Sequence, residues 1–251
     1  MLAVVWLGCS PDVWVFAPLI LGDLWFTALS TAVLGGLLRW PRFMPIYVIA
    51  IAALASFTRP VTAPLIVCIA LVVSGGVQRF TSSIRTATAL AALVAAAIVI
   101  AHAWAITGTV GVPSWLLPWV ERLRDDYAHG VVVVDRPDTF VAPAQTLFSA
   151  VALTLRKWVY FFSPWLPGYS VRHAAINLLW FGLLYAAIGV AIWRAPDRLA
   201  VHILVSYVVL LSGFHALQKL DFDHRYRIPA LPAMVMLASL SFPARKAVPD
   251  A

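Results

Sequence analysis

The most polar stretch of the chain, residues 219–227, lies between two apolar segments and reads KLDFDHRYR. Arginine carries a planar, permanently charged group that binds phosphate through two parallel hydrogen bonds, so Arg225 and Arg227 are candidate ligands for an anion. Their positions share a face if the connection is strand-like but diverge by about 200° at the start of an α-helix. A helix that begins near position 228 would add its N-terminal amides to such a site. The alternative is a basic loop that its own aspartates merely neutralise.

Two further charged side chains interrupt the apolar segments upstream. Asp23 lies inside the segment 13–38, and a carboxylate within a membrane faces a partner or a water-filled cavity. We expect it to pair with an arginine or to shape a cavity, unless the helix begins only at Pro18 and Asp23 lies near its end. Arg59 lies between two apolar segments, where a lone arginine commonly anchors a helix end at the interface.

A second basic set consists of Arg156 and Lys157, followed by Arg172 and His173. Nonspecific contact with lipid phosphates is the commoner role of such residues at a membrane surface.

The elements that would position these side chains are membrane-spanning helices. Of the 251 residues, 62% are hydrophobic and 12% are charged, and the mean hydropathy is +0.89. Soluble domains are about half apolar and about one-quarter charged, so this composition predicts an integral membrane protein. Because the backbone in hydrocarbon must satisfy its own hydrogen bonds, the spans are expected to be helices. The predicted spans are residues 13–38, 43–57, 61–77, 86–107, 173–193, 199–217 and 228–242.

The predicted orientation rests on the lysines and arginines in short connections. If residues 146–162 lie in the interface instead of crossing, one face collects most of these basic residues and is cytoplasmic. Crossing would blur this asymmetry and would place Arg156 and Lys157 near the bilayer centre, at a substantial cost in free energy. We therefore expect an all-α, multi-pass bundle of about seven spans, with interfacial helices in a long non-cytoplasmic loop at about residues 108–170. Within it, residues 131–134 form a short strand or a lining segment.

Several classes of protein are disfavoured. The formal charge of +7 resides mainly in connections between apolar segments, as membrane topology requires, so it does not indicate nucleic-acid binding. Cys9 and Cys68 lie beside or inside apolar segments and indicate neither a disulfide framework nor a metal site. No phosphate-binding loop, dinucleotide fingerprint, nucleophile elbow or H-E-x-x-H motif occurs, so nucleotide-driven and hydrolytic schemes lack support. Without internal repeats, residues 1–251 are expected to form a single integral-membrane domain.

An ordered set of motifs gives the chain a resemblance to a known class of enzymes. Residues 223–232 read DHRYRIPALP and contain the pattern R-Y-x-x-P-x-x-P. Upstream come, in order, Ser10-Pro11 with Asp23 after it, Arg59-Pro60, and the stretch from residue 155 to residue 173 with Asn177 after it. In this order the motifs are similar to those of the GT-C class of polytopic glycosyltransferases that use polyprenyl-phosphate sugars, such as the protein O-mannosyltransferases and the aminoarabinose transferases. The resemblance covers nearly the whole chain.

The resemblance implies transfer of a sugar from a polyprenyl monophosphate carrier to an acceptor hydroxyl, at the non-cytoplasmic face of a bacterial inner (plasma) membrane. The implied partners are the polyprenyl-phosphate-linked sugar and membrane lipid, with no nucleic acid. Arg225 and Arg227 would hold the carrier phosphate with help from Arg59, while Asp23 and Asp223 would orient arginines. Tyr226 would line the pocket, and Lys157 and His173 are weaker candidates at the cavity mouth. The expected substrate-binding residues are Arg59, Arg225, Tyr226, Arg227, Asp23, Asp223, His224, Lys157 and His173.

Members of this class place key acidic residues in the loop after their first span, and residues 1–7 read as the remnant of a helix downstream of that loop. The chain is therefore expected to correspond to a C-terminal portion of a larger GT-C fold, and whether it is active by itself stays open. Its catalytic residues are unknown from the sequence. No cofactor and no metal ligand is identified, and a divalent metal and the oligomeric state stay open.

Two other interpretations stay open as well. An O-antigen polymerase or ligase also combines many spans with one long outer loop and arginines. A lipid-linked-sugar transporter would not be an enzyme, and the lack of matched halves and paired broken helices counts against it. Convergence of Asp23, Arg59 and Arg225 on an outer cavity would favour the transferase.

Overall fold

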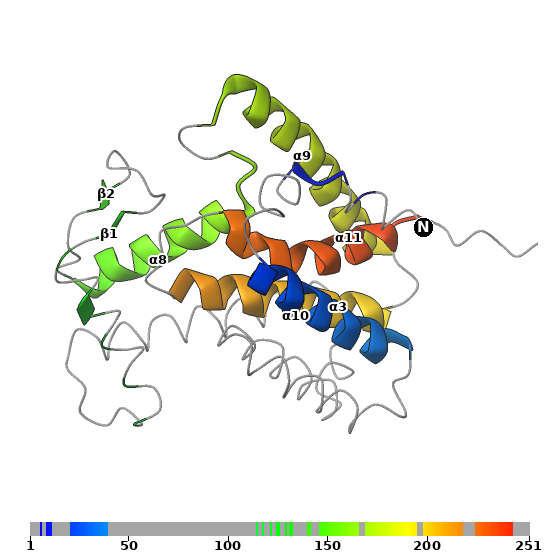
Figure 1. Cartoon of the computed structure of the whole chain (residues 1–251), viewed down its shortest axis with the longest axis horizontal. Helices are drawn as coiled ribbons and strands as arrows, with labels where there is room; N and C mark the ends of the chain where they lie inside the picture. The colour runs from blue at the N-terminus through cyan, green and yellow to red at the C-terminus, as the bar shows by residue number, and fades with distance from the viewer. Residues whose placement is uncertain are drawn as a thin grey trace, which may run out of the picture.

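A computed structural model describes residues 6, 9–11, 21–39, 146–165, 169–194, 198–217 and 224–242, with isolated positions between 114 and 141 (Figure 1). Three predicted spans, residues 43–57, 61–77 and 86–107, lie outside the described residues, and so does Arg59.

The described part of the chain is helical apart from one very short ladder. Strand β1 (Val131–Val132) pairs antiparallel with β2 (Phe140–Val141), which confirms a short strand within the predicted segment 131–134. The helices are α3 (Leu21–Arg39), α8 (Leu147–Phe162), α9 (Val171–Arg194), α10 (Arg198–Leu217), the 3-10 helix η4 (His224–Ala230) and α11 (Leu231–Ser239). Among the described residues, α9 and Leu199–Ala216 of α10 are long and apolar enough to cross a membrane. The helical class is confirmed to that extent, and the count of seven spans stays a prediction.

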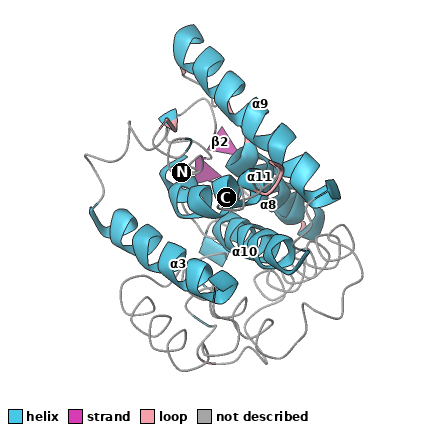
Figure 2. Cartoon of the chain, turned by 90° about the vertical axis from the view of Figure 1, so that its right-hand side faces the viewer, coloured by secondary structure: helices cyan, strands magenta, loops and turns pink. Residues whose placement is uncertain are grey.

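Helix α10 lies at the centre of the described bundle. Its residues 201–208 are all buried, as expected of a helix that is apolar on every side. Helices α3, α8 and α11 pack around it, and α11 lies between α10 and α9 (Figures 1 and 2). Helix α9 therefore contacts the bundle along one side only.

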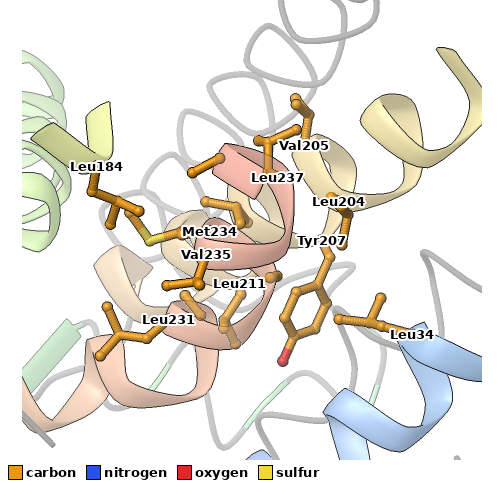
Figure 3. Packing of buried hydrophobic residues seen from close by; sticks show 14 of the residues in the cluster. Leu34, Leu184, Leu204, Val205, Tyr207, Leu211, Leu231, Met234, Val235 and Leu237 are labelled. Carbon is orange, nitrogen blue, oxygen red and sulfur yellow. The ribbon is translucent and has the colours of Figure 1, made fainter. Parts of the chain in front are cut away.

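Helix α11 supplies the middle of the core. Leu231, Met234 and Val235 are almost fully buried, and their side chains lie between Leu184 of α9 and Leu211 of α10 (Figure 3). With a rise of about 2.0 Å per residue in η4 and about 1.5 Å in α11, the two elements in line extend about 28 Å, close to the thickness of the hydrocarbon layer.

The start of the last segment differs from the prediction. Residues 224–230 form a 3-10 helix with Pro229 inside it, and the α-helix begins only at Leu231. Proline lacks an N–H group and clashes with the preceding turn of an α-helix, whereas it is tolerated in the first turn, where Pro232 lies. The first α-helical amides thus follow a hydrogen-bonded turn instead of an open helix end, so the predicted anion site at those amides lacks its expected geometry.

Helix α8 has well-defined ends. Thr146 Oγ1 accepts a hydrogen bond from the Ser149 amide at 3.2 Å, and Ser149 Oγ accepts one from the Thr146 amide at 3.1 Å, forming a reciprocal cap. The helix ends at Phe162 because Ser163 precedes Pro164, and a residue before proline avoids the helical conformation. The observed bounds confirm the predicted segment 146–162.

Candidate functional site

Arg227 is the largest of the fully buried side chains in the described residues. Its Nη1 donates hydrogen bonds to the carbonyl oxygens of Ser163 at 2.8 Å and Phe161 at 3.3 Å. The guanidinium carbon lies 3.7 Å from the centroid of the Phe181 ring. One side chain of η4 therefore connects the C-terminal end of α8 to the side of α9.

The physical reason for this arrangement is the end of α8. The last carbonyl groups of a helix have no partners within it, and they carry the negative end of its dipole. Arg227 binds two of the carbonyls at this end, and the Tyr185 hydroxyl donates to a third, that of Phe162, at 2.5 Å. A buried cation needs such hydrogen bonds and an aromatic face to offset the loss of water.

Lys157 lies on the same side of α8. It is 4% exposed and belongs to a buried stripe that also contains Leu153, Thr154 and Phe161. Positions four apart on a helix are neighbours, so Lys157 is adjacent to Phe161, whose carbonyl Arg227 binds. The structure therefore brings two predicted site residues, Lys157 and Arg227, into the same region inside the bundle. Because Lys157 faces protein, it does not incur the free-energy cost of a charge in the hydrocarbon layer, which argued against α8 crossing the bilayer. The interfacial position of α8 stays a prediction.

His173 lies in the first turn of α9, eight residues before Phe181. Its ring stacks on Tyr169 with centroids 4.1 Å apart and an interplanar angle of 11°. His173, Asn177 and Phe181 follow one another at intervals of four residues and share a face of α9. His173 is therefore about 12 Å along the helix axis from the Phe181–Arg227 contact, too far for a shared hydrogen bond.

The other predicted site residues lie in η4, in α3 or outside the described residues. His224, Arg225 and Tyr226 lie in η4. Positions two apart in a 3-10 helix are separated by about 240°, so positions 225 and 227 do not share a face, and the strand-like alternative does not hold. Asp23 lies in α3, which packs against η4, while Asp223 and Arg59 lie outside the described residues. The predicted convergence of Asp23, Arg59 and Arg225 stays untested.

Both α8 and α9 combine exposed apolar side chains with buried polar ones. Val159 is 71% exposed and Leu179 is 67% exposed, while Lys157, Asn177 and Arg227 are buried. Polar side chains that face the bundle interior while apolar ones face outward are typical of helices surrounded by lipid. This arrangement agrees with the membrane assignment that the two long apolar helices indicate.

Sequence reasoning missed the partners that fix Arg227. Phe181 and Tyr185 are two of many aromatic residues in apolar segments, and nothing in their spacing distinguishes them. The detectable signal was Asn177, a polar residue inside a span that lies on the same helical face as Phe181. Within the described residues, no group of three or more His, Cys, Asp or Glu side chains could hold a metal ion. Searches against protein families, curated proteins and solved structures find no match to this chain.

Proposed function

We propose that the chain is a multi-pass membrane glycosyltransferase, or the C-terminal part of one, that binds a polyprenyl-phosphate-linked sugar and transfers the sugar to an acceptor hydroxyl at the non-cytoplasmic face. The observation that supports it best is the pair of buried cations, Lys157 and Arg227, at the end of the bundle where η4 begins. Buried cations in a membrane protein are costly and commonly mark a site for an ion or a polar substrate.

The proposed chemistry needs positive charge near the leaving group. Departure of a polyprenyl phosphate from the sugar leaves negative charge on the phosphate, and fixed cations stabilise that charge more effectively in a dry site than in water. In this proposal Arg225 and Arg227 bind the phosphate with help from Arg59. The two carbonyl hydrogen bonds of Arg227 hold its guanidinium in place, which reduces the reorganisation needed during transfer.

The other residues have supporting roles in the proposal. Tyr226 and His224 line the pocket, Asp23 and Asp223 orient arginines, Lys157 adds positive charge inside the bundle near Arg227, and His173 lies toward the mouth. No residue is assigned as the general base.

The test is binding of a short-chain polyprenyl monophosphate to the purified chain in detergent, followed by native mass spectrometry. Arg225→Gln should weaken binding by about tenfold or more, because a charge-assisted hydrogen bond contributes about 1.5–3 kcal/mol. Arg194→Gln is the matched control, since Arg194 is exposed and lies about 20 Å further along α9 from Phe181. Equal binding by wild type, Arg225→Gln and Arg194→Gln would contradict the proposal.

A further inference from the structure

Two neighbouring side chains on α9 have buried polar atoms without hydrogen-bond partners. Asn177 is fully buried, and neither its amide nitrogen nor its amide oxygen makes a hydrogen bond. The indole nitrogen of Trp180, three residues later, is also buried and without a partner. Positions three apart lie side by side on a helix, so the three unpaired atoms belong to one patch of α9.

Two other polar groups of the described bundle are paired, although the buried Ser10 hydroxyl also lacks a hydrogen-bond partner. The indole N–H of Trp158 donates to Ser212 Oγ at 2.8 Å, and Ser206 Oγ donates to the carbonyl oxygen of His202 at 2.6 Å. An unpaired amide in an apolar interior is unfavourable enough that an exception requires an explanation. Among the described residues none is a hydrogen-bond partner of the Asn177 amide, so its donors and acceptor are open to a bound ligand.

The patch is adjacent to the Arg227 contact. The ring of Trp180 lies edge-on to that of Phe181 with centroids 4.5 Å apart, and Phe181 stacks under the guanidinium of Arg227. Asn177 precedes Phe181 by four residues and is therefore its neighbour on the buried face of α9. A ligand whose charged end lies near Arg227 could place its next groups against Asn177 and Trp180.

The unpaired atoms indicate the chemistry of those groups. The amide of Asn177 offers both donors and an acceptor, and the indole of Trp180 offers one donor. A phosphate bears only acceptors at neutral pH and cannot satisfy the amide oxygen, whereas a hydroxyl group both donates and accepts. Vicinal hydroxyl groups of a sugar therefore match the set.

We propose that Asn177 and Trp180 bind the hydroxyl groups of the carrier-linked sugar, adjacent to the phosphate held by Arg227. This inference depends on the proposed function for the identity of the ligand. Because the Asn177 amide is fully enclosed, neighbouring side chains must move to admit the sugar, and association is slower than in an open site.

The first measurement is the melting temperature of the ligand-free protein in detergent. Asn177→Leu removes unpaired polar groups at similar volume and should leave the melting temperature unchanged or raise it, and Trp180→Phe should lower it less than the same substitution at a paired indole. Trp158→Phe is the matched control that removes a paired group, and it should lower the melting temperature by about 3 °C. If Asn177→Leu and Trp180→Phe lower the melting temperature as much as this control does, the groups already have partners, such as an enclosed water, and the inference is wrong.

The second measurement compares two probes, a short-chain polyprenyl monophosphate and the same lipid carrying one hexose. Wild type should bind the hexose-bearing lipid more tightly, and Asn177→Leu and Trp180→Phe should each reduce that preference by about tenfold while binding of the plain monophosphate is unchanged. An unchanged preference in both variants overturns this inference alone. Failure of wild type to bind either lipid overturns the proposed function and the inference with it.

Discussion

Replacement of Arg227 by leucine tests whether this buried cation stabilises the end of α8. The substitution removes two hydrogen bonds, to the carbonyl groups of Phe161 and Ser163, and the contact with Phe181. Each buried carbonyl left without a donor costs about 1–3 kcal/mol, and the aromatic contact adds about 1 kcal/mol. The variant no longer carries the cost of burying a charge, which offsets part of this loss, so we expect the free energy of unfolding to fall by about 3 kcal/mol.

The assay is thermal unfolding in detergent, followed by circular dichroism. A loss of about 3 kcal/mol should lower the melting temperature by about 9 °C in a chain of this size. Arg227→Lys keeps the charge but loses the planar group that stacks and donates in two directions, so it should also be destabilised. Arg156→Leu is the control on the same helix. Arg156 is exposed, and its guanidinium lies 5.8 Å from the centroid of the Tyr160 ring, so its loss should change the melting temperature by about 1 °C or less.

An Arg227→Leu protein as stable as wild type would refute this reasoning. The free-energy cost of removing the cation from water would then equal or exceed the stabilisation that its contacts provide. In that case Arg227 would be retained for its charge alone, and loss of lipid binding in the same variant would assign it to the ligand.

Three other substitutions, one of them with a matched control, test separate parts of the described bundle by the same thermal assay. Thr146→Ala removes the N-terminal cap of α8 and should cost about 1 kcal/mol, or about 3 °C; an unchanged melting temperature would show that the cap is dispensable. Tyr185→Phe leaves the Phe162 carbonyl without its donor and should lower the melting temperature by a similar amount. An unchanged melting temperature would mean that a water molecule replaces the hydroxyl group. Leu184→Ala should cost about 2–5 kcal/mol because Leu184 is fully buried, whereas Leu183→Ala, at an exposed position, should be nearly neutral; equal effects would contradict the observed face of α9.

The limits of a helix were predictable where charged residues lie at both ends of an apolar segment. The predicted segments 173–193 and 199–217 differ by at most two residues from the observed α9 and α10. The 3-10 turn before α11 was not predicted, because hydropathy continues through residues 228–232 and only the proline positions mark the change.

The candidate site was predictable in its residue types but not in its contacts. The sequence indicates Arg227 and Lys157 as unusual cations, and both are buried at one end of the bundle. The partners of Arg227 come from positions more than 40 residues away, and packing alone brings them there. Lys157 was expected near the mouth of a site at the interface, since a charge cannot be assigned to the inner or outer face of a helix before its neighbours are known.

The packing of α3 against η4 and α11 has a consequence for biosynthesis. The first described helix finds its partners only after nearly the whole chain has been translated, because η4 and α11 end at Ser239. Until then α10, whose His202 is buried in the finished bundle, has no complete shell of protein around it, and in lipid that side chain is exposed to an apolar surrounding. Nascent chains arrested before residue 224 should therefore be recognised as incomplete by membrane quality-control proteases, and chains released after residue 242 should escape them.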